Sequence, residues 1–252
     1  MKSYWLMEPV HELGQLATPL YKSFDRKASH GVEFAGYDGG MANRYSALVP
    51  AAGQSSRMGR PKLLLPLMGR PLVAHTIGAW LQAGVDRVVV VVRPGDEPLR
   101  TVIAEMETDG RVDLVIPEIA PPEMKDSLKT ALVHVERKYG GTDNDAFLVA
   151  PADMPHLSAQ IISRLIRRHT ERCSREILLP TLAGVRGHPV LFPWRYGAEV
   201  FQLADHEGLN VLVERSPVAV VPCDDLVMAD HNPFGDIDTP DEYDQVANGR
   251  TN

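Results

Sequence analysis

A run of small and basic residues between positions 50 and 66 contains the residue types best suited to chemistry. It reads Pro-Ala-Ala-Gly-Gln-Ser-Ser-Arg-Met-Gly-Arg-Pro-Lys-Leu-Leu-Leu-Pro and directly follows a short apolar stretch that predicts a strand. Ala51, Ala52 and Gly53 are small enough for backbone N–H groups to approach a phosphate closely. Arg57 and Lys62 add positive charge to the same segment. The run therefore predicts a phosphate-binding loop at the carboxyl edge of a sheet, where open α/β sheets bind ligands.

This run does not match the sequence patterns of three well-known loops. It lacks the G-x-G-x-x-G pattern of dinucleotide-binding turns. The Walker pattern is also absent, because Lys62 follows Arg60-Pro61 rather than glycine and precedes Leu63 rather than serine or threonine. Ser55 lacks the G-x-S-x-G frame of a nucleophile elbow. Since glycine also simply makes turns, the assignment of the loop depends on the whole run.

Positions 51–66 resemble the nucleotidyltransferase signature A-A-G-x-S-x-R-M-G-x-x-K-x-L-L-P, and the match is nearly complete. The resemblance implies that backbone groups of the loop hold the phosphates of an incoming nucleoside triphosphate together with the arginine and the lysine. Arg57 and Lys62 would then be catalytic as well as binding residues. The implied nucleotide-binding residues of this loop are Ala51, Ala52, Gly53, Gln54, Ser55, Arg57 and Lys62.

An aspartate follows another predicted strand. Asp153 lies in Pro151-Ala-Asp-Met-Pro155, directly after the apolar run Ala146–Ala150, so its carboxylate is expected at the same sheet edge as the loop. Nucleotidyl transfer needs a divalent metal to neutralise phosphate charge, and the metal needs carboxylates near the loop. The family usually has G-D-M-P or C-D-M-P here, so Ala152 is a small departure that leaves Asp153 in place. The resemblance makes Asp153 a catalytic residue and a ligand of Mg²⁺, with Mn²⁺ as the alternative ion.

A second acidic segment reads Asp236-Ile-Asp-Thr-Pro-Asp-Glu-Tyr243. Thr239 and Glu242 predict a capping box with proline at the first helical position. Because Thr239 takes the capping role, Asp238 is free for another one. Relatives carry D-I-D-T-P here and use it for the second metal contact. We favour Asp238 for that contact and retain Asp236 as the alternative.

Two further segments are similar to the molybdenum cofactor cytidylyltransferases (MocA-like), of the MobA-like NTP transferase family. Residues 123–128, Glu-Met-Lys-Asp-Ser-Leu, resemble their G-M-x-x-S-L segment, which implies that Ser127 approaches the nucleotide. Residues 187–192, Gly-His-Pro-Val-Leu-Phe, resemble G-H-P-V-L-F and imply an acceptor-side role for His188, the alternative being a packed turn histidine. The A-A-G start of the loop favours CTP, since guanylyltransferase relatives tend to have A-G-G. The segment 205–210, Asp-His-Glu-Gly-Leu-Asn, departs from the family's G-D-x-G-A-R, so the reaction type is better matched than the acceptor.

The resemblance covers about residues 46–247 and implies one reaction. The terminal phosphate of an acceptor attacks the α-phosphorus of an NTP in line, and pyrophosphate leaves. The implied partners are CTP and a phosphate-bearing acceptor, the molybdopterin cofactor, and a molybdoenzyme or its chaperone is a further candidate. One alternative is a transferase that acts on a sugar or alcohol phosphate. Another is a non-catalytic nucleotide-binding module, which the retention of Lys62, Asp153 and Asp238 disfavours.

The elements that must position these residues alternate after residue 44. Apolar runs predict strands at Ala47–Val49, Arg87–Val92, Val112–Ile116, Ala146–Ala150, Ile177–Leu179, Val190–Phe192 and Ala219–Val221. Helical spacing predicts helices at Leu72–Ala83, Pro98–Met106, Ser127–Lys138 and Ser158–Arg172, near Glu199 and Val211, and from Pro240. This alternation predicts a three-layer α/β domain with a mainly parallel sheet over residues 45–247. The family resemblance implies the Rossmann-like nucleotidyltransferase fold.

Composition and the chain ends bound the remaining possibilities. Residues 1–44 show no sustained periodicity and predict a loosely ordered extension or, alternatively, an arm that packs on this chain or a partner, and 248–252 form a short tail. A formal charge of −7 disfavours nucleic acid as a partner. No apolar run approaches the roughly 20 residues that span a bilayer, and the apolar part of the first residues is too short for us to expect a signal peptide there. The sequence has only two cysteines, Cys173 and Cys223, so we expect no disulfide framework. We therefore expect a location in the reducing cytoplasm.

Overall fold

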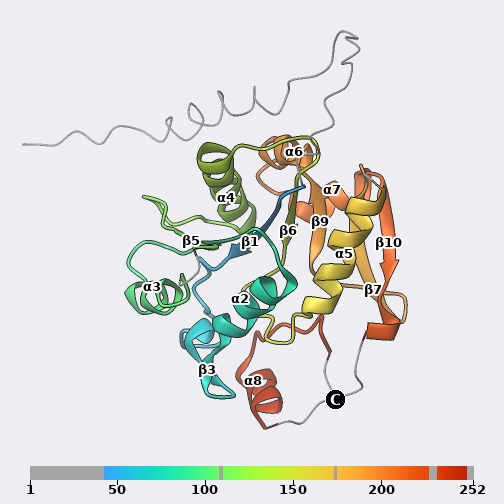
Figure 1. Ribbon diagram of the computed structural model, residues 1–252. Coiled ribbons are helices and arrows are strands. Elements are labelled where there is room, and N and C mark those ends of the chain that lie inside the picture. The colour runs from blue at the N-terminus through green and yellow to red at the C-terminus, as the bar shows by residue number, and fades with distance from the viewer. Residues whose placement is uncertain (1–42, 108–109, 173–174, 227–231, 249–252) are drawn as a thin grey trace, which may run out of the picture.

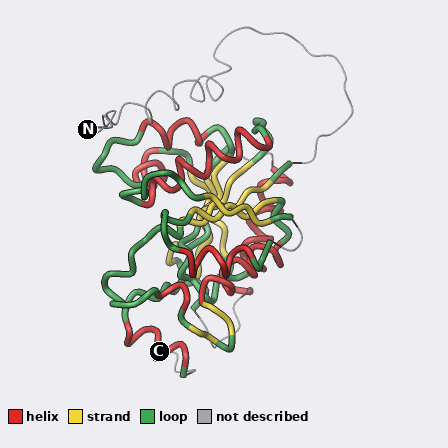
Figure 2. The backbone as a smooth tube through the Cα atoms, turned by 90° about the vertical axis from the view of Figure 1, so that its left-hand side faces the viewer, coloured by secondary structure: helices red, strands yellow, loops and turns green. Residues whose placement is uncertain are grey.

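A computed structural model of the protein describes residues 43–107, 110–172, 175–226 and 232–248. Within these ranges a central sheet lies between two layers of helices (Figures 1 and 2). Of the predicted extension and tail, only residues 43, 44 and 248 fall inside the described ranges, and Cys173 lies outside them. None of the helices in the described ranges is long and apolar enough to cross a membrane.

The predicted strands all occur and join one sheet in the order β10-β7-β9-β6-β1-β4-β5. Their bounds are β1 Tyr45–Pro50, β4 Arg87–Val91, β5 Val112–Val115, β6 Ala146–Val149, β7 Ile177–Leu182, β9 Val190–Pro193 and β10 Val218–Pro222, and β8 (Val185–Arg186) pairs with β7. The interior strand β1 runs parallel to both neighbours, with Leu48 opposite Val89 of β4 and Val149 of β6. The predicted mainly parallel sheet is therefore confirmed, and the strand that carries the loop lies inside it.

Strand β9 departs from the parallel order, because it runs antiparallel to both β6 and β7, and the short β8 also pairs antiparallel with β7. The chain leaves β7 through a tight turn in which Ala183 and Gly184 have φ values of 47° and 78°. Only the short segment 183–189 then separates β7 from β9, whereas a parallel crossover needs about a dozen residues or more. The short connection therefore sets the direction of β9.

Helices cover both faces of the sheet. Alternate side chains of β1 explain this, since Ala47 and Val49 pack in one apolar cluster and Leu48 in the other. The first cluster also contains apolar residues of α2 (Leu72–Ala83), α3 (Glu97–Ala104) and α5 (Ala159–Arg172). The second contains those of α4 (Met124–Tyr139), α6 (Tyr196–Gln202) and α7 (Leu209–Arg215). A strand buried on both faces must be apolar throughout, as Val88–Val91 is.

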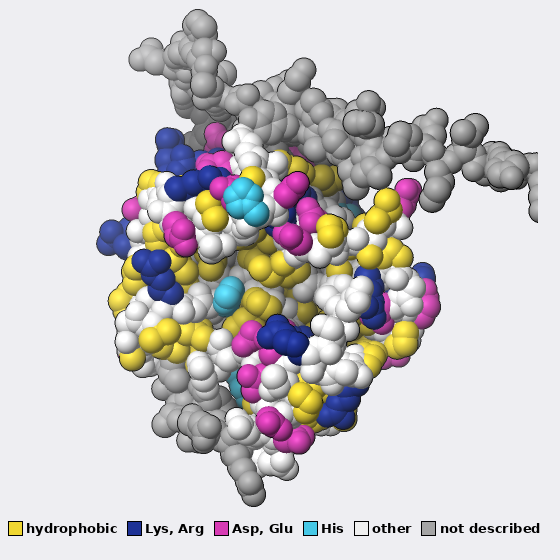
Figure 3. All heavy atoms as spheres, turned by 180° about the vertical axis from the view of Figure 1, so that it is seen from behind, with side chains coloured by type: hydrophobic (Ala, Val, Ile, Leu, Met, Phe, Trp, Pro, Cys, Tyr) yellow, Lys and Arg dark blue, Asp and Glu magenta, His cyan; other side chains and the backbone are white. Residues whose placement is uncertain are grey.

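The remaining elements are short and lie next to the functional loop or at the chain end. A 3-10 turn η1 (Lys62–Leu64) is followed by the small hairpin of β2 (Pro66–Leu67) and β3 (Arg70–Pro71). A second 3-10 turn, η2, spans Asp224–Leu226, and α8 spans Pro240–Ala247. Basic and acidic side chains of the described residues are interspersed on the face seen in Figure 3, which carries no continuous basic stripe.

Candidate active site

A cleft of about 670 Å³ lies at the carboxyl edge of the sheet. Its lining consists of residues 50–57, 120–124 and 151–153, together with Lys62, Leu63, Arg93, Ser127, Asp236 and Asp238. The loop after β1 and the segment after β6 meet here because β1 and β6 are adjacent and parallel. Every residue that the sequence predicts for the site lines this cleft, except His188.

The loop after β1 folds back on itself over the edge of the sheet. Ala51 N–H donates to the carbonyl of Val91 at 2.9 Å, which continues the β1–β4 pairing into the loop. Ser55 has a φ of 52°, and its Oγ accepts a hydrogen bond from Lys62 N–H at 3.3 Å. A Cβ placed on Gly53 would meet no other atom within 4 Å, so this part of the loop opens into the cleft. The turn at Ser55 thus brings Lys62 back beside the residues that begin the loop.

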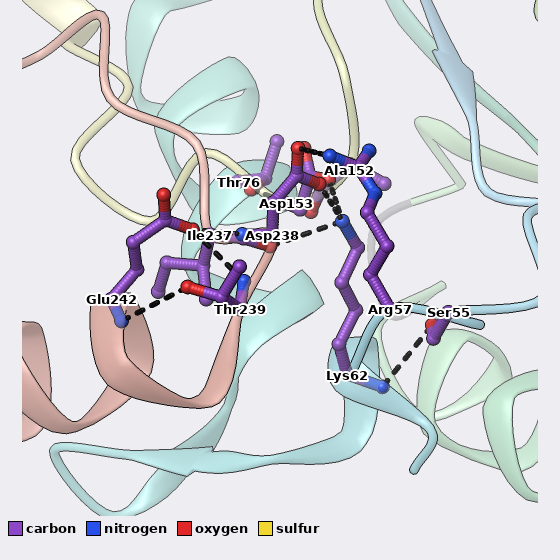
Figure 4. A network of polar contacts seen from close by, with 10 residues as sticks. All are labelled: Ser55, Arg57, Lys62, Thr76, Ala152, Asp153, Ile237, Asp238, Thr239 and Glu242. Atoms are coloured by element: carbon purple, nitrogen blue, oxygen red, sulfur yellow. Dashed lines mark hydrogen bonds and ion pairs between the residues drawn. The ribbon is translucent and has the colours of Figure 1, made fainter. Parts of the chain in front are cut away.

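The four charged residues predicted for the chemistry lie in direct contact (Figure 4). Lys62 Nζ donates to Asp238 Oδ1 at 2.9 Å and forms an ion pair with Asp153. Arg57 pairs with the other oxygen of Asp238, at 2.6 Å between its Nη1 and Oδ2. Two cations and two carboxylates from three distant parts of the chain therefore converge on one point of the cleft.

Backbone hydrogen bonds fix the segment that carries Asp153. Thr76 of α2 is fully buried, and its Oγ1 lies 3.0 Å from the carbonyl oxygens of both Ala152 and Met154. On the other side, Ile237 N–H donates to the Asp153 carbonyl at 3.1 Å. Sequence reasoning missed Thr76, although a lone hydroxyl on the apolar face of a predicted helix was a readable signal. The backbone that carries the Asp153 side chain is thus held from both sides.

The second acidic segment confirms the predicted capping box at the start of α8. Glu242 Oε2 accepts hydrogen bonds from the N–H groups of Asp238 at 2.7 Å and Thr239 at 2.9 Å, while Thr239 Oγ1 accepts from Glu242 N–H at 3.3 Å. The Asp238 carboxylate is therefore available to Lys62 and Arg57, as the sequence led us to expect. Asp236 also lines the cleft.

Burial and pairing shift the ionisation of the three central groups. Burial raises the pKa of Asp153, although its hydrogen bond from Lys62 opposes that shift. Burial alone would lower the pKa of Lys62, but hydrogen bonds to Asp153 and Asp238 raise it above its usual value. The hydrogen bond from Lys62 lowers the pKa of Asp238. Lys62 is therefore a firmly protonated ammonium in this cluster.

The other predicted residues divide between the cleft and its surroundings. Ser127 is buried near the start of α4 and lines the cleft, and its place near a nucleotide stays a prediction. His188 is not part of the lining, and burial lowers the pKa of its ring, while Asp236 and Asp153 act in the opposite direction. Arg93 lines the cleft without having been predicted. It lies two residues after the end of β4 and directly after the predicted strand, so the edge rule that located Asp153 was sufficient to find it.

The segment that departs from the family pattern is anchored to α4. Lys125 is buried, and its Nζ donates to the carbonyls of Ala204 at 2.8 Å and Glu207 at 3.1 Å, and to that of Asp205. The same ammonium pairs with Glu123, which lines the cleft, at 3.1 Å. One buried lysine therefore connects the cleft wall to residues 204–207.

The site residues fit a partly coordinated divalent cation. Within the described ranges there is no group of three or more His, Cys, Asp or Glu side chains arranged to hold a metal. Asp153 Oδ1, however, is buried and has no hydrogen-bond partner there, which leaves one carboxylate oxygen available. Mg²⁺ is commonly held by one or two carboxylates plus substrate phosphates, so Asp153 and Asp238 would be sufficient protein ligands.

An open α/β sheet with this loop, lysine and carboxylate pair at its carboxyl edge defines a class of phosphate-binding α/β proteins. Comparison with known proteins identifies the family within this class. Residues 47–224 match the family described as MobA-like NTP transferase domain, and the chain belongs to this family. The resemblance noted in the sequence is thereby confirmed.

The similar proteins act on different acceptors. The chain is 36% identical over 126 residues to 2-C-methyl-D-erythritol 4-phosphate cytidylyltransferase of Ralstonia nicotianae, covering 49% of each chain. It is 32% identical over 129 residues to molybdenum cofactor guanylyltransferase of Xanthomonas euvesicatoria, covering 51% of this chain and 57% of the relative. The chain thus spans about half the length of these curated relatives.

A solved structure covers more of the chain. The crystal structure of Rv0371c from Mycobacterium tuberculosis H37Rv matches with a TM-score of 0.65 and 25% identity, over 82% of this chain and 99% of that one. A second crystal structure of that protein is a complex with manganese. These matches confirm the Rossmann-like nucleotidyltransferase fold.

Proposed function

We propose that residues 45–247 form a Mg²⁺-dependent nucleotidyltransferase. It transfers CMP from CTP to a phosphate-bearing acceptor, with the molybdopterin cofactor as the first candidate acceptor, and releases pyrophosphate. The observation that carries this proposal is the convergence of Arg57, Lys62, Asp153 and Asp238 on one point of the cleft. Membership of the NTP transferase family supports it.

Each residue has a distinct part in the proposed reaction. Backbone N–H groups from Ala51 to Ser55 face the triphosphate, and Arg57 and Lys62 stabilise the charge that develops on the leaving pyrophosphate. Asp153 and Asp238 would hold Mg²⁺, which when bound supplies charge neutralisation at the phosphates. The acceptor phosphate is already a competent nucleophile, so the chain needs only to align it with the α-phosphorus.

Nucleotide and acceptor preferences depend on the walls of the cleft. The A-A-G start of the loop and the cytidylyltransferase relative favour CTP. Ser127 is proposed to lie near the nucleoside, and His188 to act on the acceptor side. With molybdopterin as acceptor, the product would pass to a molybdoenzyme or its chaperone.

A second candidate acceptor is an alcohol phosphate. The observation that favours it is the 36% identity over 126 residues to a cytidylyltransferase named for 2-C-methyl-D-erythritol 4-phosphate. The departure at residues 205–210 from the pattern of the molybdenum cofactor branch points the same way.

Pyrophosphate release distinguishes these possibilities. CTP, GTP and ATP are each incubated with Mg²⁺ and with molybdopterin, 2-C-methyl-D-erythritol 4-phosphate or no acceptor. We expect fast release for CTP with one acceptor and none without an acceptor, and Asp153→Asn serves as the inactive control. Nucleotide binding without release in any combination would favour the non-catalytic module.

A further inference from the structure

The ammonium of Lys62 lies between the two carboxylates that the proposed reaction assigns to a metal (Figure 4). It pairs with Asp153 and contacts Asp238 Oδ1 at 2.9 Å, and it also donates to the Ile237 carbonyl at 3.0 Å. The three side chains are largely buried, with exposed fractions of 15% for Lys62, 13% for Asp153 and 23% for Asp238. Lys62 thus occupies one oxygen of each of the two carboxylates that a divalent cation would need.

The four side chains in direct contact have balanced charges without a metal, while Asp236, whose negative charge also acts on Asp153, adds to the negative charge nearby. Lys62 and Arg57 contribute two positive charges, and Asp153 and Asp238 contribute two negative charges. A divalent cation that entered between the carboxylates while Lys62 remained would meet an ammonium at close range in a partly desolvated site, where like charges repel strongly. The metal and the ammonium therefore compete for one position.

A triphosphate changes this competition. Lys62 and Arg57 belong to the loop that lines the cleft from Pro50 to Arg57 and continues to Lys62, so phosphates bound there offer both cations new anionic partners. Moving the Lys62 ammonium onto a phosphate leaves Asp153 and Asp238 with uncompensated negative charge. That charge, together with the phosphate oxygens, completes the ligand set that Mg²⁺ or Mn²⁺ prefers.

We propose that Lys62 occupies the divalent-cation position in the nucleotide-free protein, and that the carboxylate pair accepts a metal only when a triphosphate draws Lys62 away. This inference rests on the proposed function, because it uses the same loop and the same acids. It assigns Lys62 a second role, in which it couples metal binding to nucleotide binding. Arg57 has a smaller part, since it is 71% exposed and contacts Asp238 alone among the acids.

The test is a titration with Mn²⁺ as the probe, in the absence of nucleotide. Binding is measured as the loss of the free Mn²⁺ signal in electron paramagnetic resonance. The wild-type protein should bind Mn²⁺ weakly. Lys62→Met, which keeps the length of the side chain and removes its charge, should bind Mn²⁺ at least about tenfold more tightly, within the usual range of coupling between two ligands. Arg57→Met should give a smaller gain. Lys129→Met should give none, because the Lys129 ammonium pairs with Asp126 of α4 at 3.7 Å and Lys129 is not part of the cleft lining.

Two further variants locate the effect and guard against misfolding. Adding Asp153→Asn to Lys62→Met should abolish the gain, because the carboxylate pair is then broken. Lys62→Gln repeats the neutralisation with a polar side chain, and thermal melts of all variants check the fold. If Lys62→Met and Lys62→Gln bind Mn²⁺ no more tightly than the wild type, the inference is wrong.

The same proteins separate this inference from the proposed function. Wild-type pyrophosphate release with CTP and acceptor reports on the reaction alone. The Mn²⁺ titration contains no substrate, so it reports on the position of Lys62 alone. An active wild type whose Lys62 variants show no gain overturns the inference only, whereas a gain in variants of a protein with no transferase activity overturns the proposed function only.

Discussion

Replacing Thr76 by valine tests how the fold holds Asp153 in position. The Thr76 hydroxyl is fully buried and lies 3.0 Å from the carbonyl oxygens on both sides of Asp153, those of Ala152 and Met154. Valine has nearly the same shape as threonine, so it leaves no cavity. It removes the hydroxyl group through which α2 contacts these two carbonyls. We expect the free energy of unfolding to fall by about 1–3 kcal/mol, the usual cost of leaving a buried polar group unsatisfied.

The effect of this change on turnover should be larger than its effect on stability suggests. Without the hydrogen bond from α2, the segment 152–154 is expected to shift, and a misplacement of about 1 Å can cost on the order of 10²-fold in rate. Thr76→Val should therefore lower kcat by about 10²-fold and raise the Mg²⁺ concentration needed for half-maximal rate. The KM for the nucleotide should change little, because the loop from Ala51 to Ser55 is untouched.

Thr76→Ser is the matched control, because it keeps the hydroxyl and loses a methyl group. Its stability should fall by about 1 kcal/mol from the small cavity, while kcat stays near that of the wild type. The assays are pyrophosphate release with the substrate pair that the wild type uses, and thermal or denaturant unfolding. Full activity in Thr76→Val, or equal losses of activity in both variants, would refute the positioning role of Thr76.

Three further changes probe the site and its support. Asp238→Asn should lower pyrophosphate release by at least about 10²-fold, by analogy with the loss of one preorganised charge, and Asp236→Asn should cost less; the reverse order would exchange their roles. Burial would raise the pKa of Asp113, but hydrogen bonds from three α4 side chains lower it below 3.8. The stability that ionised Asp113 contributes is therefore present above pH 3.8 and is lost as the pH falls through the lower pKa of the folded state. Asp113→Asn should therefore flatten the decline of Tm in acid. An unchanged slope of Tm against pH would contradict this. Gly187→Ala places a Cβ 2.1 Å from the Phe234 ring and should lower stability by about 1–3 kcal/mol in thermal melts, whereas an unchanged Tm would show that the ring moves freely aside.

Much of the fold was predictable because its strands are buried on both faces. The run Val88–Val92 has no polar position, as a strand covered by helices on both sides requires. Helix α2 begins and ends where its spacing predicts, and Gly84, with a φ of 80°, ends it. Helix α4 starts at Met124, three residues before the predicted Ser127, because Asp126 accepts a hydrogen bond from Glu123 N–H and extends the first turn.

The site was predictable at the level of residue types, and its internal contacts were not. The edge rule for parallel strands brings the loop and Asp153 together, and the capping box at Thr239 leaves Asp238 free. The spacing of residues in the sequence does not predict that Lys62 contacts both carboxylates, because this contact depends on how the turn at Ser55 orients η1. The support from Thr76 was equally hidden, because it comes from tertiary packing of α2 against a loop 76 residues further along the chain.

The most direct test of the proposed reaction is transfer of label from CTP carrying ³²P at the α-phosphate. In the presence of Mg²⁺ and the correct phosphate-bearing acceptor, the label should move to the acceptor in an amount equal to the pyrophosphate released. Transfer should cease when the metal is chelated and in Asp153→Asn. Tight nucleotide binding with no transfer to any acceptor phosphate, from CTP, GTP or ATP, would contradict a nucleotidyltransferase and leave a nucleotide-binding module.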